Sequence, residues 1–574
     1  MGSYLTFTFH RSKRRFMRQG KTAQTWFTNY LHRHIYGAWA KLGLMRWQFA
    51  AWILLAGISV FGVWQGFARL DSLWLAAQPV PGGVYREGIV GRVRQVNPLY
   101  VENSATADVV DVVFSKLVRT TNGTDLTSDL ATSWSVTPDR RTYTLKLRPE
   151  ARWHDGVKVT ANDVAFTFSA IQNPDTRSNL SSSWDKVVVT ALDESTVEFK
   201  LPASYSGFWA ALAQVGILPE HRLAGIPATQ YRLDEFNQRP IGSGPYILDN
   251  LSVDSDTIQL RRYPEYFLGS PRLDEVKFVQ VDDTDALIDA YAKRRIDGLS
   301  QIEPAKLDTI KGYNNLEVEA YRLPNYVGVF YNTAQPELAD KGIRAALSQA
   351  VDRKAILSEV ANDQGNVWQY PIPAGYSGFN PQARKIGFDT QAAQAALAGK
   401  ITRPLRLVTV NADPYPEIAR RLQESYRAAG VSLEVTAVDA FSLQQNYIRP
   451  RQYDILLYGQ DIGAESDVFA FWHSSQATDP GLNVSQYKSK EADAALEQAR
   501  FGRDPSFRDA KYKEFVRIWS EDVPALLLYS PAYLYAHTVA LDGVTEGNLV
   551  TPTDRLRDIH LWSLERELVP IKQN

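Results

Sequence analysis

The sequence predicts a wound α/β protein preceded by one transmembrane helix. Three observations support this: an uncharged run at 47–68, alternating strand-like and helix-like stretches after residue 82, and a β-α-β order across 405–438. The chain has 574 residues, which is too long for a single hydrophobic core. We therefore expect two to four compact units.

The N-terminal segment is strongly basic. Residues 1–46 contain nine Lys or Arg and no Asp or Glu, and the first acidic residue is Asp71. The uncharged run 47–68 would form a helix of about 33 Å, enough to cross a bilayer core of about 30 Å. Because the positive charges flank only its N-terminal side, residues 1–46 are expected to form a cytoplasmic arm, with everything after residue 69 outside.

Two other interpretations of the run 47–68 are a cleaved signal peptide and a buried helix of a soluble domain. A basic region of 46 residues is too long for a signal peptide, and Leu75-Ala76-Ala77 is a poor cleavage site. The same basic flank argues against a buried helix. We therefore expect an uncleaved signal anchor in the cell membrane, followed by a linker at 69–81, where the Pro/Gly-rich run 79–83 begins.

The charge of the remaining chain excludes some functions. Residues 70–574 carry 53 basic and 64 acidic residues, a formal charge of −11, which disfavours nucleic-acid binding. The chain contains no cysteine, so disulfides, cysteine-based zinc sites, iron–sulfur clusters and a lipid-modified N-terminal cysteine are excluded.

Hydrophobic periodicity locates the elements. Alternating or short apolar runs predict strands at Thr142–Leu147, Thr196–Leu201, Leu405–Val410, Val431–Val438, Tyr453–Tyr458 and Ala525–Tyr529. Thr160 and Asp163 form a capping-box pattern at the start of a helix. Further helices are predicted at 284–295, 340–360, 506–520 and Pro416–Ala429, the last ended by Gly430.

Catalytic signatures are absent. The sequence has no Gly-x-Ser-x-Gly, no His-Glu-x-x-His and no P-loop, and Gly242-Ser243-Gly244-Pro245 indicates a turn rather than a phosphate cradle. No catalytic residue, metal or cofactor is therefore expected. An extracellular hydrolase stays an alternative because catalytic triads need no sequence adjacency.

The stretch Ala131–Val164 closely resembles the signature region of the family 5 extracellular solute-binding proteins of ABC transporters. The matching residues are Trp134, Asp139, Arg148, Trp153, Asp155-Gly156 and Thr160–Val164. Three further segments resemble the family in the same order: Asn97–Leu99, Gly242–Tyr246 with Arg261–Phe267, and Ile343–Arg353. The resemblance extends, with gaps, from about residue 84 to 540.

This resemblance implies a two-lobe, periplasmic-binding-protein-like fold with an extra subdomain. Its expected parts are lobe I at 82–277 with an inserted subdomain at about 118–225, lobe II at 278–499, and a return to lobe I at 500–574. It implies a monomeric, membrane-anchored protein that hands peptides or other small solutes to the permease of an ABC importer. A ligand sensor with the same lobes is the alternative, although 46 cytoplasmic residues hold no signalling domain.

The resemblance also implies a ligand site. Asp461 corresponds to the family's acidic residue for the peptide ammonium, and the backbone of Tyr458 and Gly459 is expected to pair with the ligand. Glu102, Asn103 and Ser104 are expected to form the opposing edge, with Tyr331, Asn332, Phe471 and Trp472 as walls. The competing interpretations are that Asp461 caps a helix near Glu465 and Asp467, and that the aromatic residues are ordinary core.

Overall fold

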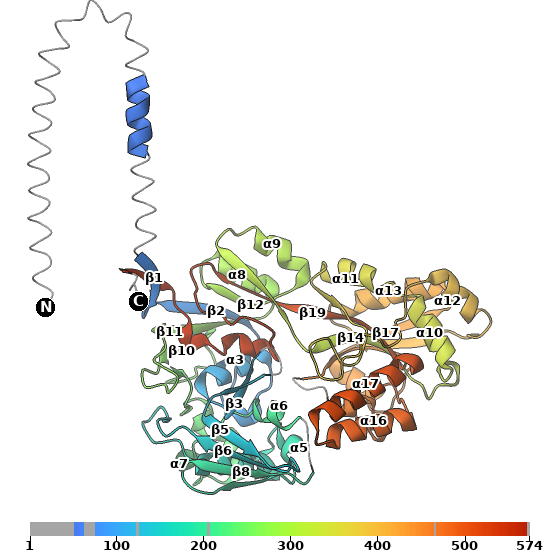
Figure 1. Ribbon diagram of the computed structural model, residues 1–574, viewed down its shortest axis with the longest axis horizontal. Coiled ribbons are helices and arrows are strands. Elements are labelled where there is room, and N and C mark those ends of the chain that lie inside the picture. The colour runs from blue at the N-terminus through green and yellow to red at the C-terminus, as the bar shows by residue number, and fades with distance from the viewer. Residues whose placement is uncertain (1–50, 62–74, 122–124, 204–206, 464–466, 571–574) are drawn as a thin grey trace, which may run out of the picture. The chain divides into compact units, whose positions relative to one another are not determined.

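The computed structural model describes residues 51–61, 75–121, 125–203, 207–463 and 467–570 (Figure 1). Residues 51–61 form a helix, and its large apolar side chains, such as Trp52 and Ile53, are exposed. Within these ranges, no helix is long and apolar enough to cross a membrane. The predicted arm 1–46 lies outside the described residues, as do both ends of the predicted membrane segment 47–68.

A twelve-stranded sheet organises the compact unit that spans Pro79–Arg566. Ten strands follow one another across it in the order β17 (Leu433–Val438), β16 (Leu405–Val410), β18 (Ile455–Asp461), β14 (Asn325–Tyr331), β19 (Ala525–Thr538), β12 (Gly298–Ile302), β2 (Val84–Val90), β11 (Glu275–Val281), β10 (Thr257–Arg262) and β9 (Tyr246–Ile247). Beside this path, β13 (Leu316–Arg322) and β15 (Gly365–Val367) also pair with β19. A separate two-stranded sheet consists of β1 (Leu75–Val80) and β20 (Glu565–Pro570).

The long strand β19 joins the two halves of the large sheet (Figure 1). Its first residues pair with β14, whereas its later residues pair with β12 and β13. The apolar side chains divide in the same way, because Leu528 packs in the cluster around β14 and Leu534 packs in the cluster around β12. We call the strands β2 and β9–β13 the first half of the sheet, and β14–β18 the second half.

The apolar clusters divide the chain at other places than the predicted lobe boundaries at 277/278 and 499/500. Leu287 and Leu299, predicted in lobe II, share an apolar cluster with Val279 at the end of β11. Trp519, predicted in the return to lobe I, packs against Trp472 in the second half. The chain passes from the apolar clusters of the first half to those of the second half near residue 323, between β13 and β14. It passes back inside β19, because β14 pairs with the first residues of that strand and β13 with its later residues.

In the first half, β2 is the central strand and pairs in parallel with both β11 and β12. The helix α8 (Thr284–Ala292) connects β11 to β12 and packs closely on β2. At Gly88 an added Cβ would lie 2.6 Å from side-chain atoms of Leu287 and Ile296, so the close approach requires glycine. Two more helices, α3 (Ser104–Val113) and α9 (Leu307–Lys311), belong to this half.

In the second half, the predicted β-α-β order is confirmed. The strands β16 and β17 pair in parallel and are connected by α13 (Tyr415–Ala428), which ends before Gly430 at φ +83°. The single helix predicted at 340–360 is instead two, α10 (Lys341–Gln349) and α11 (Arg353–Ala361), because Asp352 caps a new N-terminus. The other long helices are α12 (Thr390–Leu397), α16 (Lys490–Phe501) and α17 (Pro505–Asp522).

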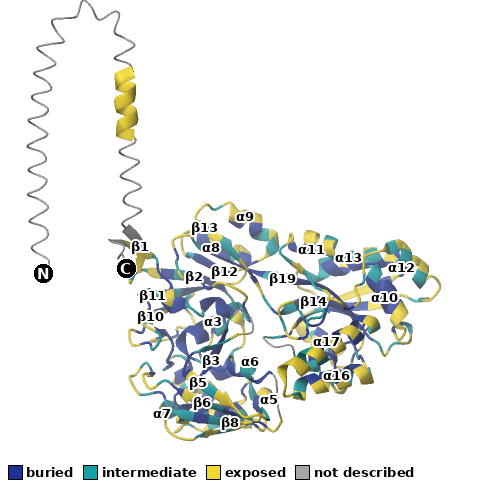
Figure 2. Cartoon of the chain, in the orientation of Figure 1, coloured by how far each residue is buried: buried dark blue, intermediate teal, exposed yellow. Residues whose placement is uncertain are grey.

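A smaller antiparallel sheet lies in the part of the chain that carries the family resemblance. Its strands are β5 (Ala131–Val136), β6 (Thr142–Leu147), β8 (Thr196–Lys200) and β7 (Val188–Ala191), and β3 (Val118–Thr121) pairs with β4 (Asp125–Ser128) nearby. The predicted capping box of Thr160 and Asp163 starts α4 (Ala161–Gln172) and is confirmed. Five short helices complete the described α-helices: α5 (Ser181–Trp184), α6 (Phe208–Leu212), α7 (Glu220–Leu223), α14 (Ala440–Ser442) and α15 (Phe469–Trp472). Figure 2 shows buried residues along the central strands and exposed residues on outer faces of helices such as α16.

A buried ionic network holds the C-terminal part of the chain on the first half. The guanidinium of Arg555, 1% exposed, donates to Glu87 Oε1 at 3.0 and 3.1 Å and to Asp108 Oδ2 at 2.7 Å. Thr553 donates to the same Asp108 carboxylate at 2.8 Å. Because both carboxylates are almost fully buried, they depend on Arg555 for compensation. The network fixes the segment around residue 555 to β2 and α3.

Candidate functional site

Asp461 lies at the end of β18, opposite Asn325 of β14. Its Oδ1 atom accepts a hydrogen bond from the Gly463 N–H at 2.9 Å, and Gly463 has φ +70°, so the two residues form a turn. Within the described residues, Asp461 has no cation at ion-pair distance. This carboxylate can therefore accept further hydrogen bonds from a ligand.

The surroundings of Asp461 disfavour its charge. Although the side chain reaches solvent, desolvation by the neighbouring walls raises the pKa of its carboxyl, and the hydrogen bond from Gly463 offsets part of that rise. An ammonium group placed beside it would remove this penalty by supplying an opposite charge. The site is thus chemically suited to a cationic group.

Asp461 lines a cavity of about 490 Å³, which we call the Asp461 pocket. Its walls come from distant parts of the chain: Ile462 and Asp467 in the second half, Ala211 and Gln214 at α6, and the pair Val550-Thr551. Asp467 is paired with Arg500 at 3.2 Å and accepts a hydrogen bond from Phe469 N–H at 3.3 Å. Asp467, and not Asp461, therefore accepts the hydrogen bond from the first backbone N–H of α15, which argues against a capping role for Asp461.

A second cavity, of about 280 Å³, lies beside α3, and we call it the α3 pocket. It shares Gln214 with the Asp461 pocket and is lined by Val101, Val110 and Thr553 among others. Asp111 in its wall forms an ion pair with Lys116. Burial alone would raise the pKa of Asp111, but the attraction of Lys116 and Arg119 outweighs it and lowers that pKa. Asp111 and Lys116 compensate each other's charge, so neither is left to pair with a charged ligand in this pocket.

The predicted backbone sites Tyr458 and Gly459 lie in β18 and pair with Gly328 and Val327 of β14. On the other side of β18, pairing with β16 covers only Ile455 and Leu456. At Gly459 an added Cβ would lie 2.6 Å from the hydroxyl of Tyr415, so that side chain stands close to the strand. Ligand pairing at Tyr458 and Gly459 stays a prediction.

The predicted opposing edge, residues 102–104, is occupied by the start of α3. Asn103 caps this helix, because its Oδ1 accepts from Thr106 N–H at 2.8 Å. Glu102 is exposed and lies 3.7 Å from Arg232. Ser104 is the first residue of the helix. None of the three lines the Asp461 pocket or the α3 pocket, and their contact with a ligand stays a prediction.

Three of the predicted walls are core residues, which corrects the expectation. Tyr331 is fully buried, with its hydroxyl 3.0 Å from that of Ser348. Asn332 is also fully buried and donates to the Tyr453 carbonyl at 2.9 Å, and Trp472 is 1% exposed. Polar and aromatic side chains occur both in ligand sites and in hydrogen-bonded cores, so the sequence pattern could not tell which of the two these residues form. Phe471, half-buried against the same core, lines neither pocket.

Sequence reasoning missed the residues that the first half contributes. Gln214 and the segment Val550–Thr553 line the pockets but belong to no motif, and they lie hundreds of residues from one another. No local pattern could have located them. The described residues contain no group of three or more His, Cys, Asp or Glu side chains suited to hold a metal ion.

The fold and the pocket define a binding protein whose two lobes are the halves of one sheet, with an acidic pocket lined from both. The profile of the bacterial extracellular solute-binding proteins, family 5 (middle region), matches residues 125–481, and this chain belongs to that family. It is a solute-binding protein rather than an enzyme.

Individual relatives match over most of their length. The chain is 26% identical over 514 residues to the oligopeptide-binding protein AppA of Bacillus subtilis, covering 86% of this chain and 93% of AppA. It is 25% identical over 531 residues to the dipeptide-binding protein of Escherichia coli K12, covering 84% and 95%.

Solved structures confirm the two-lobe α/β fold. AppA of Bacillus subtilis in complex with a nonapeptide superposes with a TM-score of 0.69 at 26% identity, covering 85% of this chain and all of AppA. The substrate-binding protein CtaP of Listeria monocytogenes superposes with a TM-score of 0.76 at 25% identity, covering 84% of this chain and all of CtaP. The two-lobe, periplasmic-binding-protein-like fold that the sequence predicted is therefore confirmed.

Proposed function

We propose that this protein binds peptides between its two lobes, with the peptide ammonium at Asp461, and delivers them to the permease of an ABC importer. The observation that carries the proposal is the carboxylate of Asp461, which has no counter-charge among the described residues and lies in a pocket lined from both lobes. The names of two relatives support the solute class, because one is an oligopeptide-binding and the other a dipeptide-binding protein.

Ammonium binding follows from the physical chemistry of the pocket. A charge-assisted hydrogen bond between an ammonium and a carboxylate is about twice as strong as a neutral one and fixes the direction of the ligand. Desolvation already raises the pKa of Asp461, so pairing with a cation recovers free energy that the empty pocket lacks. A neutral solute can donate a hydrogen bond to this carboxylate but does not compensate its charge, and an anionic solute is repelled by it.

Membrane anchoring is the second part of the proposal. The uncharged run 47–68 and the basic arm 1–46 support a single-pass anchor with the arm in the cytoplasm and the binding lobes outside. The anchor would keep a monomeric binding protein beside its permease. Protease added to intact cells should digest the lobes and spare an N-terminal tag, and protection of the lobes would contradict this orientation.

Peptide binding is tested by identifying what copurifies with the full-length chain. The chain is extracted from membranes in mild detergent, and its bound solutes are released by acid and identified by mass spectrometry. Peptides with free α-amino groups are expected. Recovery of a sugar or a metal chelate in place of peptides would refute the proposed solute class.

A further inference from the structure

Sulfur-containing side chains are confined to the N-terminal arm of this protein. The chain has no cysteine, and its three methionines are Met1, Met17 and Met45. Residues 46–574 therefore contain no sulfur atom, although the chain has 24 Phe, 28 Tyr and 14 Trp. The change in composition coincides with the start of the predicted membrane segment at residue 47, so sulfur is restricted to the proposed cytoplasmic side.

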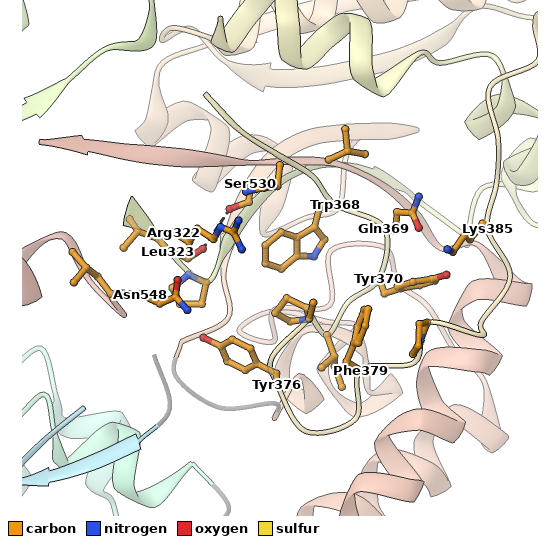
Figure 3. A pocket seen from close by; sticks show the side chains of 18 residues that line it. Arg322, Leu323, Trp368, Gln369, Tyr370, Tyr376, Phe379, Lys385, Ser530 and Asn548 are labelled. Atoms are coloured by element: carbon orange, nitrogen blue, oxygen red, sulfur yellow. Dashed lines mark hydrogen bonds between the residues drawn. The ribbon is translucent and has the colours of Figure 1, made fainter. Parts of the chain in front are cut away.

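The ligand site has the same composition. A cavity of about 320 Å³, which we call the aromatic pocket, has Pro324 in its wall. The carbonyl of Pro324 accepts a hydrogen bond at 2.8 Å from the N–H of Ile462, in the wall of the Asp461 pocket, and we call these two adjacent pockets the groove. Figure 3 shows rings such as Trp368 and Tyr376 around the aromatic pocket, and the side chains that line it consist of carbon, nitrogen and oxygen.

The apolar interior of both halves is built without methionine. The unbranched side chain of Met fills irregular gaps in cores and is common on surfaces that bind many different partners. Here the apolar clusters consist of Ala, Val, Leu, Ile and aromatic side chains, such as Leu287 in the first half and Leu528 in the second. A large core and a groove for solutes would both favour Met, so its complete replacement indicates a requirement other than packing.

Sulfur is the atom of a protein that oxidants attack most readily. Hydrogen peroxide transfers one oxygen atom to the thioether of Met: the O–O bond breaks, an S–O bond forms, and the products are the sulfoxide and water. The sulfoxide is polar, so it disrupts an apolar core or a binding surface. Reductases can restore the thioether, and the cytoplasm keeps thiols reduced, so sulfur inside the cell is better protected than sulfur outside it.

The tryptophans of the binding lobes, whose indole rings oxidants also attack, are shielded from solvent. None of the eight Trp in the unit Pro79–Arg566 is exposed. Five are at most 3% exposed, namely Trp153, Trp184, Trp472, Trp519 and Trp562, and three are half-buried, namely Trp134, Trp209 and Trp368. An oxidant in the solvent around this unit therefore meets neither a sulfur atom nor a fully exposed indole.

Saving of sulfur is the other interpretation of this composition. A cell that is short of sulfur would gain from removing Met anywhere in an abundant protein, so economy predicts a loss from the arm as well. Met17 and Met45, which the start of translation does not require, are nevertheless present. The distribution along the chain therefore favours protection of the outer part over economy.

We propose that the binding lobes are adapted to capture solutes in surroundings that contain sulfur-oxidising agents such as peroxides. This inference rests on the proposed orientation, in which residues 1–46 lie in the cytoplasm and the lobes outside. It adds that solute binding and the folded state persist at oxidant doses that convert accessible methionine to its sulfoxide. The protection comes from the side chains chosen for the core and the groove and needs no repair enzyme.

Graded oxidation of the full-length chain in detergent tests the proposal. The chain is treated with hydrogen peroxide, and a parallel sample of N-acetylmethionine shows at which doses a thioether is oxidised. After removal of the peroxide, the melting temperature is measured, and the retention of a pool of synthetic peptides without Cys or Met is measured by mass spectrometry. At doses that oxidise N-acetylmethionine completely, the wild type should keep both its melting temperature and its retention.

Two double variants introduce the same number of thioethers at different places. The groove variant carries Ile462→Met, in the wall of the Asp461 pocket, and Leu549→Met, in the wall of the aromatic pocket. The surface variant carries Leu233→Met and Leu482→Met, at side chains that are 88% and 50% exposed and line neither pocket. Each protein is compared with its own untreated sample. Oxidation should lower the retention of the groove variant by roughly tenfold, because a sulfoxide places an unpaired polar group in an apolar wall, and should leave that of the surface variant unchanged.

The outcomes separate this inference from the proposed function. A wild type that loses retention or melting temperature as steeply as the groove variant would overturn the inference, and so would a groove variant that keeps its retention. Cells that make more of the chain when sulfate is limiting, and not when peroxide is added, would replace protection by sulfur economy. If the untreated wild type retains no peptide, peptide binding is refuted, and the melting temperatures still decide whether the lobes resist oxidation.

Discussion

Replacing Asp461 with Asn removes one charge and changes little else in the pocket. The Asn side chain keeps an Oδ1 atom that can accept the Gly463 N–H bond, so the turn after β18 should persist. The lost interaction is a hydrogen bond between two charged groups, which contributes about 1.5–3 kcal/mol. The affinity for a peptide with a free ammonium should therefore fall by roughly 10- to 150-fold.

Titration calorimetry with matched ligands measures this effect. A peptide that the wild type binds and its N-acetylated form are each titrated into the wild type and Asp461→Asn. The free peptide should lose affinity in the variant, whereas the acetylated peptide, which has no ammonium, should bind both proteins alike. Equal losses for both peptides would refute the assignment of Asp461 as the ammonium site.

The stability of the empty protein provides an independent check. Because desolvation raises the pKa of Asp461, the folded state binds this proton more tightly than the unfolded state does. The ionised carboxylate therefore destabilises the fold at neutral pH, and this cost disappears as the pH falls through the raised pKa. Asp461→Asn should not lower the melting temperature of the empty protein. A clear drop would favour a structural role in the turn.

Three further predictions concern stability, measured by urea unfolding. Arg555→Met should lower the unfolding free energy by about 3–5 kcal/mol because it leaves two buried carboxylates uncompensated; Arg420→Met, at an exposed helical ion pair, should change it little. Gly242→Ala places a Cβ 1.9 Å from a backbone carbonyl oxygen of α3 and should destabilise strongly, whereas Gly225→Ala, with no atom within 4 Å, should not. Burial lowers the pKa of His154 from 6.5 to about 4, so the unfolded state takes up the proton at a higher pH than the folded state does. The unfolding free energy should therefore fall as the pH drops from 6.5 to about 4. An equal fall in a His154→Asn variant would contradict this.

Local patterns in the sequence predicted local structure well. The capping box of Thr160 and Asp163 and the β-α-β order of 405–438 involve residues close together in the chain, and both are confirmed. The break between α10 and α11 was missed because the apolar spacing continues across it, and only the cap by Asp352 marks the new helix. Helical periodicity is insensitive to such an interruption.

The candidate site could be predicted only in part. Asp461 was located through the family resemblance, and the structure places it in a pocket. Tyr331 and Trp472 were misassigned because burial depends on which partners the fold brings, and their partners lie on other strands and helices. Gln214 was missed for the same reason, since it meets Asp461 only through the packing of distant segments.

The bond between Arg555 and Glu87 connects residues 468 positions apart, which has a consequence for synthesis of the chain. The first strand of the large sheet leaves the ribosome long before its counter-charge exists, and β19, which joins both halves, is also made late. An incomplete chain would have to bury two uncompensated carboxylates, so it stays open rather than folding early. The last tenth of the polypeptide therefore decides when the groove can form, and a ribosome that stops before residue 555 releases a chain that quality-control proteases can degrade.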